Sequence, residues 1–437
     1  MTESAVTDLT SFATATAPAR GSALSERLIG SEILKVAAQI RAMQKAGKTI
    51  CNLTVGDFDP RHFPIPECLQ RGIVAALARG ETNYPPSNGV PELRAAVQAF
   101  YARELGLGYP LESILIASGA RPVIYGTFRT VVDPGERVVY PTPSWNNNHY
   151  VSLLGAAAVP VPCGPETKFM PTAAQLQPLL RGARLLCLNT PQNPSGTMIE
   201  RADLQEICEL ILTENRAREG SGQRPLYLMY DHIYWLLAFG STQHHTPPAL
   251  LPEMARYTIF VDGISKAFAA TGLRVGWAVG PTDLIEKMGS LLGHVGAWAP
   301  RPEQFATAEL LADRAAIRTY HAGYAAALTN RLQRLYRGFQ ALRVEGLPCD
   351  ALEPQGAIYL SAKIAPFGKR TPAGATLRSN DDVRRYLLEA AGVAIVPFQA
   401  FGVQGDTGWF RLSVGAVSEA DIEQALPRIS EALRVLQ

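Results

Sequence analysis

A chain of 437 residues is long for one hydrophobic core, so its length predicts one large and one smaller domain. Hydrophobic residues make up 47% of the sequence and charged residues 18%, and the net charge of +2 gives no reason to expect a nucleic-acid partner. The six cysteines are scattered without a CxxC pair, which predicts a reduced, cytoplasmic protein with no metal site. Because no apolar run is long enough to span a bilayer, we expect no membrane partner.

Residues 1–28 are rich in alanine, threonine and serine and lack the apolar segment that a signal peptide needs. We expect them to form a flexible N-terminal arm. The following segment, 29–64, is expected to join the C-terminal part of the chain in the smaller domain.

Short apolar runs alternate with amphipathic stretches from about residue 114 onward. We predict strands at Ile114–Ala117, Arg137–Tyr140, Ala157–Val161, Arg184–Leu188, Leu226–Tyr230, Thr258–Val261 and Val275–Val279. The clearest helical pattern runs over Arg201–Arg218, where apolar residues recur every three or four positions. This alternation predicts an α/β fold in residues 65–315, with a mostly parallel seven-stranded sheet covered by helices on both faces.

The pattern changes after about residue 315. A long helix expected at Tyr320–Leu342 leads to short strands at Ala357–Leu360 and Phe410–Val414. Residues 29–64 and 316–437 are therefore expected to form a smaller α+β domain.

Polar residues follow several of the predicted strands, at the sheet edge where open α/β folds bind ligands. Gly119, Ala120 and Arg121 come directly after the first strand, and the free amides of a helix that starts there could bind a phosphate. Trp145, after the second strand, could stack on a flat ligand or pack within its own loop. Asn193 lies in the Asn-Pro-Ser-Gly turn that follows the fourth strand.

Charged residues follow the fifth and sixth strands. The fifth strand runs into Asp231, which is costly at the end of a buried strand unless it meets a cation, and Tyr234 comes three residues later. Lys266 comes after the sixth strand, preceded by Ser265 and followed by Arg274. Part-buried near that arginine, its amine would lose charge and become a nucleophile toward carbonyl groups, although most single lysines lie at the surface.

The order of these residues and their positions at strand ends resemble the pyridoxal-phosphate (PLP)-dependent aminotransferases of fold type I, class I and II, the aspartate aminotransferases in particular. The resemblance rests on Asn193, Asp231, Tyr234, Lys266 and Arg274 and covers nearly the whole chain after the arm. It implies an enzyme with PLP as its cofactor, bound to Lys266 as a Schiff base, in a large PLP-binding domain. It also implies that Asp231 pairs with the ring nitrogen, while Asn193 and Tyr234 donate to the 3′-oxygen.

The resemblance places the cofactor phosphate at the turn Gly119–Arg121, with Ser265 and Arg274. The sequence departs from the family at Gly263, where a serine is common three residues before the lysine. The departure removes one hydroxyl group, so we expect fewer phosphate donors rather than a loss of binding.

The resemblance assigns five further roles. It implies that Trp145 stacks on the cofactor ring and that Gly56 and Asn193 lie near the substrate. It implies that Arg411 binds the α-carboxylate, for which a planar guanidinium suits better than an ammonium group. By itself, Arg411 on a short strand would most often be an exposed charge. Tyr84 would reach the phosphate of a neighbouring subunit, which predicts a homodimer.

The implied reaction moves an amino group from an amino acid to a 2-oxo acid, with Lys266 as general base and acid for the Cα proton. Two alternatives stay open at this point. Another PLP chemistry on the same fold, such as β-elimination, decarboxylation or oxidation, would use the same Asp231 and Lys266. A non-catalytic regulator would need a DNA-binding segment, and the arm shows no helix-turn-helix pattern.

Arg121 favours dicarboxylic substrates, because a guanidinium can pair with a distal carboxylate through two parallel hydrogen bonds. With Arg411 on the α-carboxylate, two fixed cations would select aspartate or glutamate. Arg121 could instead bind the phosphate or face solvent, and Arg301 or His294 could be the selector. Trp298, in the same segment as these two residues, indicates some tolerance of aromatic substrates.

Overall fold

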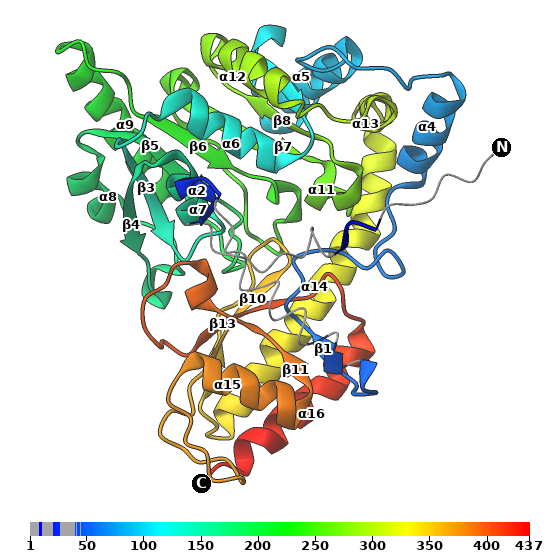
Figure 1. Ribbon diagram of the computed structural model, residues 1–437, viewed down its shortest axis with the longest axis vertical. Coiled ribbons are helices and arrows are strands. Elements are labelled where there is room, and N and C mark those ends of the chain that lie inside the picture. The colour runs from blue at the N-terminus through cyan, green and yellow to red at the C-terminus, as the bar shows by residue number, and fades with distance from the viewer. Residues whose placement is uncertain (1–7, 11–20, 27–39, 41, 44) are drawn as a thin grey trace.

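The computed structural model describes residues 8–10, 21–26, 40, 42, 43 and 45–437, so most of the predicted arm lies outside the described residues. A large sheet with its helices fills one end of the molecule, and smaller sheets with long helices fill the other (Figure 1). Within the described ranges, no helix is long and apolar enough to cross a membrane.

The large sheet has seven strands in the order β2-β8-β7-β6-β5-β3-β4. Its strands are β2 (Ile114–Ala117), β3 (Arg137–Thr142), β4 (Ala157–Pro162), β5 (Ala183–Asn189), β6 (Tyr227–Asp231), β7 (Thr258–Gly263) and β8 (Gly276–Val279). Only β8 runs antiparallel to its neighbours, β2 and β7. The predicted mostly parallel, seven-stranded sheet is therefore confirmed.

Helices cover both faces of this sheet, because apolar side chains on successive strand residues point to opposite sides. The helices in this part are α4 (Glu67–Ala78), α5 (Pro91–Leu105), α6 (Ala120–Val131), α7 (Asn147–Leu154), α8 (Ala173–Leu180), α9 (Arg201–Glu219), α10 (Pro247–Leu250), α11 (Ile264–Ala267), α12 (Thr282–Val295) and α13 (Arg301–Ala312). Helices α6, α7 and α12 pack on the face that contains Met229 and Val261. Helices α5, α9 and α13 pack on the face that contains Tyr230 and Phe260.

The rest of the chain forms a second core around an antiparallel sheet in the order β12-β13-β10-β9 and a parallel pair, β1-β11. The elements are β1 (Cys51–Asn52), α14 (Arg314–Val344), β9 (Cys349–Ala351), β10 (Tyr359–Ile364), α15 (Asn380–Tyr386), β11 (Val393–Ala394), β12 (Val396–Pro397), β13 (Trp409–Ser413) and α16 (Glu419–Arg434), with α2 (Ala23–Glu26) near the N-terminus. The long helix α14 runs from the side of the large sheet into this second core (Figure 1). The domain bounds given above stay predictions.

One predicted strand begins in the wrong place. The strand expected at Ala357–Leu360 is β10, which begins at Tyr359 and continues to Ile364. Ala357 has a φ of +60° and donates its N–H to the carbonyl oxygen of Leu237 at 2.9 Å, so it belongs to a turn. The sequence shows that these residues are apolar, but it does not show that the first two belong to a turn rather than to the strand.

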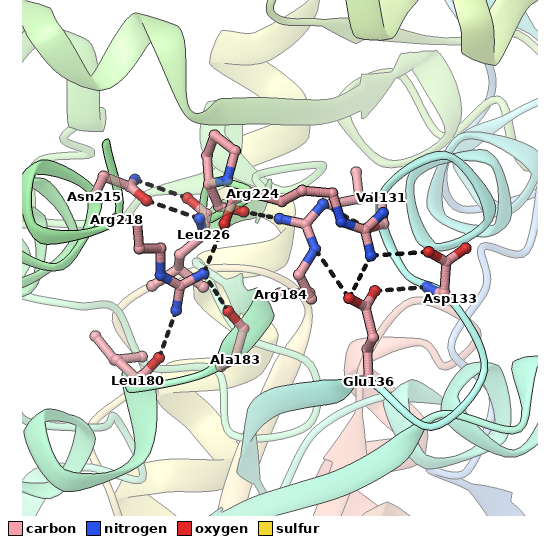
Figure 2. A network of polar contacts seen from close by, with 11 residues as sticks. Val131, Asp133, Glu136, Leu180, Ala183, Arg184, Asn215, Arg218, Arg224 and Leu226 are labelled. Atoms are coloured by element: carbon pink, nitrogen blue, oxygen red, sulfur yellow. Dashed lines mark hydrogen bonds and ion pairs between the residues drawn. The ribbon is translucent and has the colours of Figure 1, made fainter. Parts of the chain in front are cut away.

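Buried arginines fix the amino ends of neighbouring strands, at the sheet edge opposite the predicted site (Figure 2). Arg218, on α9, is 4% exposed and donates to the carbonyl oxygens of Leu180 at 3.0 Å and Ala183 at 2.7 Å. Arg184, at the start of β5, donates to the carbonyl oxygen of Val131 at 3.0 Å. These side chains satisfy carbonyl groups at the last residues of α6 and α8 and at the first residue of β5.

A second set of contacts in Figure 2 holds the start of β6. The Asn215 side chain accepts from the N–H of Leu226 at 2.7 Å and donates to its carbonyl oxygen at 2.9 Å. Arg224, two residues earlier, forms an ion pair with Glu136. Because Asp231 ends the same strand, these contacts help to fix where its carboxylate lies.

We predict that Arg218→Met lowers the free energy of unfolding by about 2–4 kcal/mol, because it leaves buried carbonyl oxygens without their charged donor. Urea denaturation of the cofactor-free protein measures this loss. Arg216→Met is the matched control on the same helix, since Arg216 is 65% exposed in its ion pair with Glu253. That exposed pair is worth about 0–1 kcal/mol, so equal losses in the two variants would contradict the role given to Arg218.

Candidate active site

A cavity of about 700 Å³ lies at the carboxyl ends of the large-sheet strands and is closed on one side by β10 and β13. It brings together most residues predicted from the sequence: Gly56, Ala120, Arg121, Trp145, Asn193, Asp231, Tyr234, Ser265, Lys266, Arg274 and Arg411. Gly119 lies next to this set at the start of α6, whereas Tyr84 lies outside it. No cluster of histidine, cysteine or acidic side chains that could hold a metal ion occurs in the part of the chain that the structure describes.

Lys266 lies on the short helix α11, directly after β7, and its side chain reaches the cavity. Its Nζ donates to the carbonyl oxygen of Gly56 at 2.6 Å. Burial lowers the pKa of Lys266 to about 8; Asp57 opposes this shift, and nearby arginines add to it. A substantial fraction of the amine is therefore neutral near pH 8, as a nucleophile or a general base requires.

Gly263, the position that departs from the family, is explained by the packing of β7 on β8. A Cβ atom at residue 263 would lie 2.6 Å from the carbonyl oxygen of Val275 and 2.7 Å from the Cα of Gly276. Strand β8 is antiparallel and pairs with β7 at this point. A serine would push the two strands apart, so the missing hydroxyl group follows from a close backbone contact.

Asp231 ends β6 and faces the cavity. One carboxylate oxygen accepts from the N–H of Ile233 at 3.2 Å, and none of the ion pairs among the described residues involves this carboxylate. Burial raises the pKa of Asp231 to about 7. A carboxylate that lacks a cation in a buried site fits a protonated ring nitrogen.

Tyr234 contacts a residue that the sequence did not predict for the site. Its hydroxyl group lies 2.8 Å from the hydroxyl group of Tyr359 on β10, and both side chains line the cavity. Burial raises the pKa of Tyr234 well above 10, and Tyr359 adds to the shift. No local motif marks Tyr359, because its position depends on the pairing of β10 with β13.

Arg411 is 2% exposed, so its interpretation as a surface charge is wrong. It lies on β13, between β10 and β12. Its Nη1 donates to Oδ1 of Asn193 at 3.1 Å and its Nη2 to the carbonyl oxygen of Thr54 at 2.6 Å. The guanidinium lies 4.8 Å from the ring centre of Tyr359 and 4.9 Å from that of Phe401, and its Nε has no partner. A buried cation with an unused donor fits a carboxylate ligand.

The turn that carries Asn193 is clamped onto β10. Gly196 has a φ of +71°, and a Cβ atom there would collide with the carbonyl oxygen of Tyr359. Ser361 on β10 donates its hydroxyl group to the carbonyl oxygen of Ser195 at 2.8 Å. The close approach therefore requires glycine and fixes Asn193 relative to the second core.

The start of α6 has the features of an anion site. Gly119 precedes the helix with a φ of +93°, and a Cβ atom there would collide with the guanidinium of Arg274. Arg274 donates to the carbonyl oxygen of Ser118 at 3.0 Å, and Ser265 lines the cavity nearby. A helix N-terminus beside a guanidinium and a hydroxyl group fits a phosphate.

Arg121 is an exposed residue at the same helix start. Its guanidinium lies over the Trp145 ring, 4.6 Å from the ring centre. His149, which no pattern in the sequence marks, also lines the cavity.

Several other predicted residues lie away from the cavity. Tyr84 is 81% exposed, and its ring centre lies 5.3 Å from that of Trp298. Arg301 forms an ion pair with Glu81 at 2.6 Å, and His294 lies in the last turn of α12. None of these side chains lines the cavity of its own chain.

Comparison with known proteins places this site in a family. The family model for aminotransferase class I and II matches residues 48–429. An aspartate aminotransferase of Rhizobium meliloti (strain 1021) is 33% identical, over 92% of this chain and 93% of the relative. A probable aspartate/prephenate aminotransferase of Thermus aquaticus is 31% identical, over 92% of this chain and 97% of the relative.

Solved structures agree. The aspartate aminotransferase from Rhizobium meliloti superposes with a TM-score of 0.86 at 31% identity, over 96% of this chain and all of that one. The Thermus thermophilus aspartate aminotransferase with maleate gives a TM-score of 0.82 at 30% identity, over 95% of this chain and all of that one. The chain therefore belongs to the aminotransferase class I and II family and is a PLP-dependent aminotransferase.

Proposed function

We propose that this aminotransferase transfers the amino group of a dicarboxylic amino acid, aspartate or glutamate, to a 2-oxo acid. The observation that carries the proposal is the placement of two arginines, Arg121 and Arg411, on the same cavity as Lys266. The matched relatives are named aminotransferases, which supports transamination over β-elimination, decarboxylation or oxidation. The Thermus thermophilus relative was solved with maleate, a four-carbon dicarboxylate, which supports a diacid.

In this proposal PLP, when bound, supplies the electron sink that makes the substrate Cα proton acidic. Lys266 would hold the cofactor covalently and, once released, its Nζ would take the Cα proton and deliver it to the C4′ carbon of the cofactor. Asp231 would pair with the ring nitrogen, and Tyr234 and Asn193 would donate to the 3′-oxygen. Gly119, Ala120, Ser265 and Arg274 would hold the phosphate, and Trp145 would lie against the ring. Tyr359 would orient the Tyr234 hydroxyl group.

Arg411 would bind the α-carboxylate near Gly56 and Asn193, since it is fixed by two hydrogen bonds and keeps its Nε free. Arg121 would bind the distal carboxylate. Contact with the Trp145 ring would hold its guanidinium at the cavity, where it could pair with an anion. The competing interpretations are that Arg121 binds the cofactor phosphate or faces solvent.

We also propose a homodimer. Tyr84 is a large exposed side chain held against Trp298, and Arg301 is held by Glu81 nearby. Residues placed in this way could complete the cavity of a second subunit, as the family resemblance implies for Tyr84. His294 would belong to the same surface.

All six cysteines are free, which supports the proposed cytoplasmic location.

Borohydride reduction of the enzyme with PLP, followed by peptide mapping, should place the adduct on Lys266. Lys266→Ala should abolish turnover, whereas Lys287→Ala, at an exposed position of α12, should not. The rate of PLP attachment should rise as the pH increases through about 8, because only the neutral amine reacts and burial lowers the pKa of Lys266 to that value. An adduct on another lysine would refute the assignment.

Arg121→Ala should lower kcat/KM for aspartate and glutamate by roughly ten- to a hundredfold, since a charged hydrogen bond is worth about 1.5–3 kcal/mol. Phenylalanine and alanine should be affected much less. Arg121→Lys keeps the charge and should recover part of the diacid activity. An equal loss on all four substrates would assign Arg121 to the cofactor and contradict the diacid proposal.

Sedimentation at micromolar concentration should report a dimer of the 47.2 kDa chain. Tyr84→Phe should keep the dimer but weaken cofactor binding, because it removes only a hydroxyl group. A fully active monomer would be incompatible with shared sites.

A further inference from the structure

A buried hydrogen-bond chain lies on the face of the large sheet opposite the cavity. It contains Asp262 at the end of β7, His232 after β6 and Tyr101 on α5, which are each at most 1% exposed. Neither Asp262 nor His232 lines the cavity. Asp231 pairs in register with Val261, so Asp262 is one residue beyond the partner of Asp231 and points to the other side of the sheet.

The carboxylate of Asp262 accepts several hydrogen bonds. Its Oδ1 accepts from the N–H of Gly263 at 2.7 Å. Its Oδ2 accepts from Nε1 of Trp235 at 3.0 Å and from the hydroxyl group of Tyr101 at 3.2 Å. His232 Nε2 lies 3.7 Å from the same oxygen. Burial of a carboxylate is costly, and these donors offset part of that cost.

The chain continues from Tyr101 to a loop. The Tyr101 hydroxyl group lies 2.8 Å from Nε2 of His232, and Nδ1 of His232 lies 3.3 Å from Nε2 of His244. His244 is a half-buried residue in the loop before α10, and its Nδ1 is buried without a protein partner. These hydrogen bonds therefore connect Asp262 to His244, in the loop before α10.

Two proton arrangements satisfy every contact in this chain. In the first, Asp262 is ionised, so Tyr101 donates to it, His232 Nε2–H donates to Tyr101 and His244 Nε2–H donates to His232. In the second, Asp262 is protonated and donates to Tyr101, Tyr101 donates to His232 Nε2, and His232 Nδ1–H donates to His244. The second arrangement has one more proton: the entering proton occupies Nδ1 of His244, and the shifts along the hydrogen bonds leave another proton on Asp262.

One proton entering at His244 converts the first arrangement into the second. The Nε2 proton of His244 moves to Nδ1 of His232, the Nε2 proton of His232 moves to the Tyr101 oxygen, and the Tyr101 proton moves to Oδ2 of Asp262. Both histidines are neutral before and after, and burial lowers the pKa of His232 well below 6.5 and that of His244 to about 3. The net result of these shifts is therefore that Asp262 becomes protonated and loses its charge.

We propose that Asp262 is a positioning residue of the active site that exchanges one proton with solvent at the His244 loop, through Tyr101, His232 and His244, and whose charge acts on Asp231 across the sheet. In the described residues the titratable groups that face Asp262 are Tyr101 from α5 and His232 from the segment after β6, and β8 contributes the indole of Trp277. Asp231, at the end of β6, acts on Asp262 from the other face of the sheet.

The pKa of Asp262 is consistent with proton exchange near neutral pH. Burial raises the pKa of Asp262 to about 7, its donors oppose the shift, and the charge of Asp231 adds to it. A cation bound at Asp231 would cancel that charge, so Asp262 would release its proton when a protonated ring binds. By reciprocity, ionised Asp262 favours the protonated form of the ring.

Infrared difference spectra of the cofactor-free protein across neutral pH test whether Asp262 takes up and releases a proton. The wild-type protein should show carboxylic-acid absorption that titrates near neutral pH and contains components from both Asp231 and Asp262. Asp262→Asn should remove one component and leave that of Asp231, whereas Asp203→Asn, at a control acid that is part-buried on α9, should keep both. An unchanged band in Asp262→Asn would overturn the proposal. This measurement needs neither PLP nor substrate, so it is independent of the proposed function.

Nitrogen NMR of protein labelled at its histidines tests the chain. The proton of His232 should move from Nε2 at high pH to Nδ1 at low pH in the wild type. It should stay on one nitrogen in Tyr101→Phe, which keeps the ring but breaks the path. A tautomer that does not change with pH in the wild type would overturn the relay.

The absorbance of the enzyme with bound PLP, titrated without substrate, tests the link to the site. Asp262→Asn should shift the transition to lower pH, because removal of a nearby negative charge disfavours the protonated cofactor. Asp203→Asn should leave the transition in place. A wild-type transition in Asp262→Asn would show that its charge does not reach the site and would contradict the proposal.

Discussion

Desolvation of two opposite charges is the constraint on which this site depends. Asp231 and Lys266 are both removed from water at adjacent strand ends, yet no ion pair joins them, and burial moves the pKa of each toward neutrality. The fold holds them apart because β6 and β7 are parallel neighbours fixed in register. A cofactor that carries both a cation and a carbonyl group offsets both desolvation costs, because the cation pairs with Asp231 and the carbonyl group reacts with Lys266. The arginines at the opposite edge of the sheet contribute by holding the segment that leads into β6, the strand that ends in Asp231.

Much of this arrangement could be predicted from the sequence. The strands were readable because both faces of the sheet are buried, which leaves continuous apolar runs such as Arg184–Leu188. Asp231 and Lys266 could be assigned because each directly follows such a run, and the carboxyl ends of parallel strands meet at one edge. Even the departure at Gly263 could be seen in the sequence, although its cause, a backbone contact with β8, could not.

The rest depends on contacts between residues distant in the chain. Tyr359 enters the site only because β10 pairs with β13, and the same pairing buries Arg411. Asp262 stands beside the lysine motif without any local sign of its side-chain partners, Tyr101 from α5 and Trp235 from the segment after β6. Tyr84 lies outside the cavity of its own chain, so a single sequence and a single subunit carry little information about its role.

The glycine turn that clamps Asn193 to β10 has a mechanical consequence. Because a backbone contact without room for a Cβ atom joins the two cores at Gly196, they cannot slide past each other at that point. Any rotation of one core against the other would pivot there, and displacements would grow with distance from the turn. Asn193 and Arg411 would stay in register throughout such a motion. Entry and exit of ligands should therefore be sought in segments far from this pivot.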